Sequence, residues 1–159
     1  MFIVLLFSFL IGIFIPVIVH TSADRHPQLL ELWEKSVRAS HHFLNDAQIL
    51  KIRQQIIDHN YFTHVQLFHV EHQQQILGFM GIAGNKLEML FVSPAAFRKG
   101  IGSQLLQHAL ALGVTEVDVN EQNPDATAFY LKHGFEMISR SETDAEGNPY
   151  PILHLQLKN

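Results

Sequence analysis

The first part of the chain has a short extended pattern followed by two helical ones. Residues 16–21 are mostly β-branched and apolar, which predicts a strand directly before a helix that ends near Ser40. Pro27 falls in the first turn of that helix, where its missing N–H costs nothing. The N-cap candidates are Thr21, Ser22 and Asp24. The apolar stripe consists of Leu29, Leu30, Trp33 and Val37.

The rest of the chain reads as one α/β domain around a mixed sheet. Asn45 followed by Gln48 is typical of a capping box, and it opens a second helix that ends near Asp58. A helix opening near Gly100 and another that carries Tyr130 are expected further on. The expected strands cover residues 65–70, 76–83, 87–92, 117–120, 135–140 and 152–157, with turns at 72–75 and 84–86.

Two glycines stand at the start of the third helix. Gly100 and Gly102 follow Arg98 and Lys99, and they let the backbone approach a ligand closely. The first N–H groups of a helix lack internal partners and lie at the positive end of its dipole, so a phosphate or pyrophosphate is the expected guest. No Lys follows Gly102, which excludes a P-loop, and the third glycine of a dinucleotide fingerprint is missing.

A second motif, VNEQNPDATAFYLKHGF, covers residues 119–135. Together the two motifs resemble the GNAT superfamily of acetyl-CoA-dependent N-acyltransferases, and the resemblance covers roughly residues 16–159. The first is similar to the family's pyrophosphate motif Q/R-x-x-G-x-G/A, and the second to V-x-x-x-N-x-x-A-x-x-F-Y-x-x-x-G-F. One departure is Phe97, which stands where the family has Gln or Arg. Residues 32–44 and 140–151 are also similar to a bacterial subgroup, the YjaB-like acetyltransferases.

The resemblance implies a GNAT fold, with a mixed, mostly antiparallel sheet flanked by about four helices. It implies transfer of acetyl from acetyl-CoA to a primary amine of a small molecule or peptide, by direct attack through a tetrahedral intermediate. Tyr130 occupies the family's general-acid position, although it can also serve only to pack its ring. The expected cofactor-binding residues are Leu90, Phe91, Val92, Arg98, Lys99, Gly100, Ile101, Gly102, Ser103, Asn123 and Tyr130.

The general base has several candidates. Glu88 lies where the family often has a glutamate that acts through water, and strand alternation puts it on the same face as Leu90 unless a bulge intervenes. His41 and His42 are rivals, because the loop between the first two helices borders the acceptor pocket in this fold and imidazole has a suitable pKa. The expected substrate-binding residues are His41, His42, Phe43 and Tyr150.

Composition narrows the classes of partner. The 159 residues include 11 Lys and Arg and carry a net charge of −4, which argues against nucleic-acid binding. The absence of Cys excludes disulfides, thiolate metal sites and a Cys nucleophile. The 11 histidines show no metal-ligand spacing, so no metal is expected. A homodimer is compatible with the family.

The first 19 residues contain no charge and allow three interpretations. A transmembrane helix needs ~20 apolar residues, and a signal peptide needs a basic start that is missing here. The third interpretation assigns residues 16–159 to the catalytic domain and leaves 1–15 as an apolar extension, either a membrane anchor or translated sequence upstream of the true start. A cytoplasmic protein is expected, with an inner-membrane-associated form whose domain faces the cytoplasm as the alternative.

Two rival functions remain at this point. One is a non-catalytic acyl-CoA-binding module, which would keep the glycine loop and lose the acid. The other is a membrane-tethered acetyltransferase. The presence of Tyr130 counts against the first, whereas Phe97 and the undecided base count for it.

Overall fold

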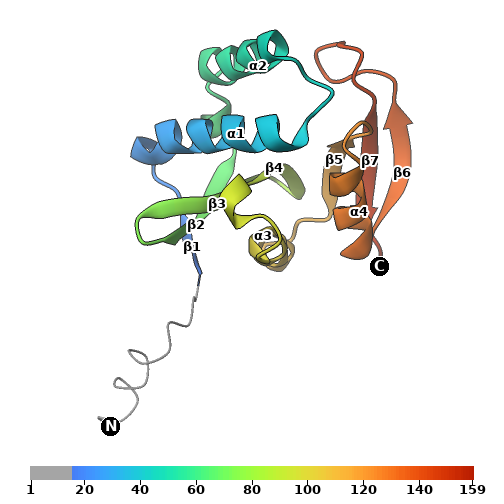
Figure 1. Cartoon of the computed structure of the whole chain (residues 1–159). Coiled ribbons are helices and arrows are strands. Elements are labelled where there is room, and N and C mark those ends of the chain that lie inside the picture. Colours follow the sequence, from blue (N-terminus) through green and yellow to red (C-terminus); the bar gives the residue numbers. More distant parts are fainter. Residues whose placement is uncertain (1–15) are drawn as a thin grey trace.

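The computed structural model describes residues 16–159, which form one seven-stranded sheet with helices on both faces (Figure 1). The strands are β1 (Val17–His20), β2 (Gln66–His72), β3 (Gln75–Ala83), β4 (Lys86–Val92), β5 (Glu116–Asn120), β6 (Phe135–Ser141) and β7 (Ile152–Leu157). The helices are α1 (His26–Ser40), α2 (Asp46–Asp58), α3 (Ile101–Ala111) and α4 (Pro124–Lys132). Short 3₁₀ turns are η1 (Ala23–Arg25), η2 (Tyr61–His64) and η3 (Pro94–Ala96). The predicted α/β architecture is confirmed.

The sheet order is β1-β2-β3-β4-β5-β7-β6, and only the β4–β5 pair is parallel. Alternate strand residues supply two cores. Leu67 and Phe79 pack with α1 and α2 on one face, whereas Val70 and Met80 pack with α3 on the other. Figure 1 shows α1 and α2 above the first strands and α3 below them, with α4 beside β5 and β7. The sheet is therefore mixed and mostly antiparallel, as expected.

The start of α1 differs from the prediction. The chain first makes the 3₁₀ turn η1, and α1 then begins at His26 with Pro27 in its first turn. Ser22 precedes η1 but makes no capping bond, and Thr21 instead uses its hydroxyl to bond Nδ1 of buried His69 at 2.8 Å. The predicted caps were wrong because Thr21 is already committed to β2, a contact 48 residues away in the chain.

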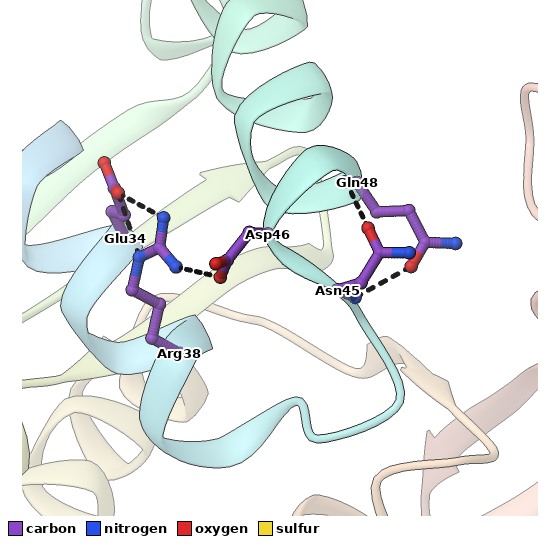
Figure 2. Close-up of polar contacts among 5 residues, drawn as sticks. All are labelled: Glu34, Arg38, Asn45, Asp46 and Gln48. Carbon is purple, nitrogen blue, oxygen red and sulfur yellow. Dashed lines mark hydrogen bonds and ion pairs between the residues drawn. The ribbon is translucent and has the colours of Figure 1, made fainter.

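The junction of α1 and α2 is held by local polar contacts (Figure 2). The predicted capping box is confirmed: Asn45 accepts from the Gln48 backbone N–H at 2.9 Å, and the Gln48 side chain accepts from the Asn45 N–H at 2.8 Å. Arg38 of α1 reaches Glu34 at 3.0 Å and crosses to Asp46, the first residue of α2, at 2.6 Å. These contacts fix both ends of the loop at residues 41–45.

Asn45→Ala is expected to lower the free energy of unfolding by about 1 kcal/mol, because a helix N-cap is lost. Urea unfolding followed by circular dichroism measures this change. Gln54→Ala on the same helix is the matched control, since it removes only an exposed bond to Asp58. An unchanged urea midpoint for Asn45→Ala would contradict the stabilising role of the box.

Helix α3 lies unusually close to β3. A Cβ added at Gly78 would come within 2.9 Å of Ile101 Cγ2 and 3.1 Å of the Phe91 carbonyl oxygen. Only glycine therefore lets the first turn of α3 settle against the sheet. The turn between β2 and β3 is shorter than the predicted turn at 72–75. It consists of Gln73 and Gln74 alone, with φ of 49° and 65°.

The predicted apolar extension at residues 1–15 lies outside the described residues. Within residues 16–159, no helix combines the length and the apolar character needed to span a membrane.

Candidate active site

Strands β4 and β5 part from one another near the middle of the sheet. They pair only through Lys86 with Glu116 and Leu87 with Val117. A cavity of about 120 Å³ lies where they part. Its lining comes from β4, β5, α4 and the end of α1: His41, Leu87, Glu88, Met89, Leu90, Phe91, Val117, Asp118, Val119, Asn120, Asn123, Ala126 and Tyr130. Residues far apart in the sequence therefore meet at one point in the sheet.

A β-bulge at Glu88 explains the parting. Met89 pairs with Gly81 and Leu87 with Ile82, so Glu88 has no partner on β3. Simple alternation therefore fails here: Leu87 packs in the α3 core, whereas Met89 packs against the α1–α2 core. Bulges bend a strand and re-aim its side chains. Glu88 is exposed and lines the cavity.

Tyr130 projects from α4 into the same cavity and is only 7% exposed. Its ring packs on Phe129 and Phe135, with centroids 5.1 and 5.7 Å apart. Burial raises the pKa of the Tyr130 hydroxyl above its ordinary value of 10. No group within residues 16–159 forms a hydrogen bond with this hydroxyl. The side chain is therefore a protonated donor without a protein acceptor in that part of the chain.

The start of α3 offers a cluster of unpaired donors. Gly100 adopts a left-handed conformation with φ of 82°, and Arg98 does so with φ of 60°. The N–H groups of residues 100–103 meet no acceptor within residues 16–159. A Cβ at Gly102 would meet Phe129 at 3.6 Å and Val92 at 3.7 Å, which is ordinary contact. The protein itself thus has room for a side chain at Gly102.

The neighbouring side chains fit an anionic guest at this loop. Arg98 and Lys99 are exposed beside the donors, while Ile101 is 1% exposed and anchors the turn in the core. Ser103 contributes its hydroxyl to Nε2 of His133 at 3.1 Å. Phe97, at the departure from the family motif, is 38% exposed after η3. The donors and cations match a pyrophosphate in charge and chemistry.

The two ends of the site are adjacent. Val92 ends β4, the strand that lines the cavity through Leu90 and Phe91, and it lies at contact distance from the Gly102 position. Phe129 lies there too, next in sequence to Tyr130. A ligand could therefore run along β4 from the donor cluster at α3 into the cavity.

Three of the four residues expected on the acceptor side come together. His41 lines the cavity, its ring lies 5.5 Å from Phe43, and Phe43 lies 6.0 Å from Tyr150. The Tyr150 hydroxyl accepts from Gln48 at 2.6 Å. His42 is exposed and is not among the residues that line the cavity.

The electrostatic state of His41 is set by its surroundings. Burial, with a smaller contribution from the nearby His42, lowers the pKa of His41 to about 4. Its Nδ1 lies 2.8 Å from the Ser40 hydroxyl.

Asn123 also lines the cavity. Its side chain accepts a hydrogen bond from the Ala126 N–H at 3.2 Å and so caps α4.

The sequence interpretation missed a polar chain across four strands. Lys86 donates to Asp118 at 2.6 Å, Asp118 bonds Nδ1 of His154 at 2.7 Å, and Nε2 of His154 lies 2.7 Å from the Ser141 hydroxyl. The sequence does contain a signal for this chain of contacts, because the charged Asp118 stands between two valines of an expected strand, and both valines prove to be buried. Within residues 16–159, no three His, Asp or Glu side chains gather in a way that could hold a metal ion.

Comparisons with known proteins agree with this geometry. Residues 63–137 match the model of the acetyltransferase (GNAT) domain. The chain is 38% identical over 138 residues to the peptidyl-lysine N-acetyltransferase YjaB of Salmonella typhimurium (strain LT2), covering 83% of this chain and 93% of the relative. It is 35% identical to the protein of the same name from Escherichia coli (strain K12), covering 80% and 87%.

Solved structures give the same result. The solution structure of apo-form YjaB from Escherichia coli matches with a TM-score of 0.80 and 31% identity, covering 90% of this chain and 97% of that one. A GNAT family acetyltransferase from Elizabethkingia anophelis with acetyl-CoA bound matches in fold, with a TM-score of 0.66, 16% identity, and 91% and 98% coverage. The chain therefore belongs to the GNAT family, as its motifs predicted, and is an acetyl-CoA-dependent N-acetyltransferase.

Proposed function

We propose that the enzyme acetylates the side-chain amine of lysine in a protein or peptide, and that residues 16–159 form its catalytic domain. The main observation behind this proposal is the cavity where β4 and β5 part. Tyr130 lies on its wall, and the unpaired N–H groups at the start of α3 lie at its end. The curated relatives are named for peptidyl-lysine acetylation, which supports this acceptor. We also infer a cytoplasmic location, because acetyl-CoA is a cytoplasmic metabolite.

The donor site is proposed to extend along β4. The N–H groups of residues 100–103 bind the pyrophosphate, and Arg98 and Lys99 balance its charge. Backbone groups of Leu90, Phe91 and Val92 hold the rest of the donor, and Asn123 holds the loop beside it. Once bound there, acetyl-CoA supplies an acetyl group activated as a thioester.

Tyr130 is proposed as the general acid. Its hydroxyl keeps its proton at neutral pH because burial raises its pKa. It lacks a protein hydrogen-bond acceptor within the described residues, so the proton is available to a group in the cavity. Donation to the departing sulfur gives a neutral thiol and avoids a free thiolate in a partly closed site.

The acceptor side suits a cationic amine. Glu88 lines the cavity without an ion pair in the described residues, whereas Asp118 beside it is paired with Lys86, and the whole chain has a net charge of −4. His41, Phe43 and Tyr150 are proposed to hold the aliphatic part of the lysine side chain. A carboxylate and an aromatic wall together favour a long amine-ended side chain over an anionic or bulky one.

The test uses purified full-length protein, acetyl-CoA and N-terminally blocked peptides that contain one lysine. We expect mass spectrometry to find one acetyl group on that lysine. Matched peptides with arginine or Nε-acetyl-lysine at the same position should gain none. Acetylation of small primary amines with no reaction of any lysine peptide would reject the proposed acceptor while leaving the acetyltransferase assignment intact.

A further inference from the structure

A short hydrogen-bonded chain ends α1 at the cavity. The Ser40 hydroxyl lies 2.8 Å from the Ser36 carbonyl oxygen and 2.8 Å from Nδ1 of His41. A carbonyl only accepts, so the single proton of Ser40 goes to Ser36. Ser40 must then accept from His41, which places a proton on Nδ1 of the imidazole.

This arrangement fixes the tautomer of His41. A neutral imidazole with its proton on Nδ1 has a lone pair on Nε2. Nε2 forms no hydrogen bond with any residue in the described range 16–159, and the ring lines the cavity with Tyr130. The nitrogen that remains for a ligand is therefore a proton acceptor.

Burial, assisted by the nearby His42, keeps the His41 ring neutral. The titratable groups that line the same cavity are Glu88 on β4, Asp118 on β5 and Tyr130 on α4, and His42 adjoins His41 in the loop. Because burial lowers the pKa of His41 to about 4, its Nε2 lone pair is present throughout the neutral range. Protonation removes the lone pair only as the pH falls towards that value.

The loop that carries His41 is fixed on both sides. Arg38 joins α1 to Asp46, and the capping box holds Asn45 (Figure 2). On the other side Phe43 packs between His41 and Tyr150. The exposed Glu88, by contrast, has no hydrogen bond within the described residues that fixes its carboxylate. Because a catalytic group must be held in a defined position, His41 is a better candidate for the general base than Glu88.

We propose that Nε2 of His41 accepts the proton that the attacking nitrogen loses as it bonds to the acetyl carbon, with Ser40 as its positioning residue. This inference rests on the proposed function. The lysine ammonium first releases one proton to water, which leaves a neutral amine with a lone pair. The amine then attacks: the C–N bond forms and the C–S bond breaks, the second proton of the nitrogen goes to Nε2, and Tyr130 protonates the sulfur. The imidazolium and the tyrosinate return to their starting states by proton exchange through water. The nitrogen carries a positive charge once it is bonded to the acetyl carbon, so its proton is more acidic than that of a free alkylammonium and is lost as the amide forms.

His41→Ala tests the base directly. We expect kcat on a lysine peptide to fall about 100-fold, the scale of general-base catalysis, while calorimetry finds acetyl-CoA binding unchanged. Added imidazole should restore part of the rate, and more basic imidazole derivatives should restore more. His64→Ala, an exposed histidine in η2 outside the cavity, is the matched control and should keep the wild-type rate.

Ser40 provides a second test that is independent of turnover. Nitrogen-15 NMR of the histidines should find the Nδ1-protonated tautomer for His41 in the wild type and in Ser40→Thr, and a mixture in Ser40→Ala. An Nε2-protonated ring in the wild type, or His41→Ala with full kcat or no imidazole rescue, would overturn the inference while lysine acetylation stands. Absence of lysine acetylation by the wild type would overturn the proposed acceptor as well.

Discussion

Gly102→Trp is expected to abolish measurable acetyl-CoA binding. The glycine lies in the first turn of α3, where the N–H groups of residues 100–103 are unpaired and the backbone is open to a ligand. A Cβ at this position meets Phe129 at 3.6 Å, which is ordinary contact, so the attachment point itself causes no clash. Losing three charge-assisted hydrogen bonds weakens affinity by about 1000-fold or more. Isothermal titration calorimetry on purified protein measures this loss.

Gln107→Trp is the matched control for a bulky aromatic on the same helix. Gln107 is exposed near the other end of α3, so its substitution should leave both folding and affinity unchanged. Circular dichroism establishes that each variant keeps the wild-type fold. Wild-type affinity in a folded Gly102→Trp protein would refute the assignment of this loop to the pyrophosphate. Measurable affinity in the wild type would also mean that Phe97, where the family has a polar side chain, is compatible with donor binding.

Tyr130→Phe is expected to lower kcat about 1000-fold, within the range for removing a general acid, and to leave acetyl-CoA affinity unchanged. The substitution keeps the ring that packs on Phe129 and Phe135. It deletes a hydroxyl with no protein hydrogen bond in the described part of the chain, so stability should change little. Steady-state kinetics on a lysine peptide measures the effect.

The acid role of Tyr130 also predicts how kcat changes with pH. A general acid works only while protonated, and burial raises the pKa of Tyr130 above 10. The wild-type kcat should therefore show no alkaline decline from this group between about pH 7 and 9. Tyr61→Phe, which removes a bond to exposed Glu146 outside the cavity, should keep the wild-type rate. A Tyr130→Phe enzyme with full kcat would exclude the acid role.

Local sequence was enough to predict most elements and the donor loop. The capping box at Asn45, the strands and the two glycines before α3 all depend on residues within a few positions of one another. Their physics is short-ranged, because it consists of capping bonds, side-chain periodicity and backbone freedom. The family was predictable for the same reason, since both motifs lie within contiguous loop–helix segments.

The arrangement of the site depended on contacts distant in sequence. The start of α1 was displaced because Thr21 bonds His69 on β2. The face on which Glu88 lies was decided by a bulge against β3, and bulges depend on the partner strand rather than on local propensity.

The sequence by itself determined the fold class, the family and the identity of the candidate groups. Only the tertiary structure decided which of them meet: it gathers His41, Glu88 and Tyr130 around one cavity and leaves His42 outside. It also decided their proton states, since the tautomer of His41 follows from Ser40 and Ser36, and the raised pKa of Tyr130 follows from burial. Both effects depend on the hydrogen-bond partners and the burial that folding gives to each side chain, and these cannot be seen in the linear sequence.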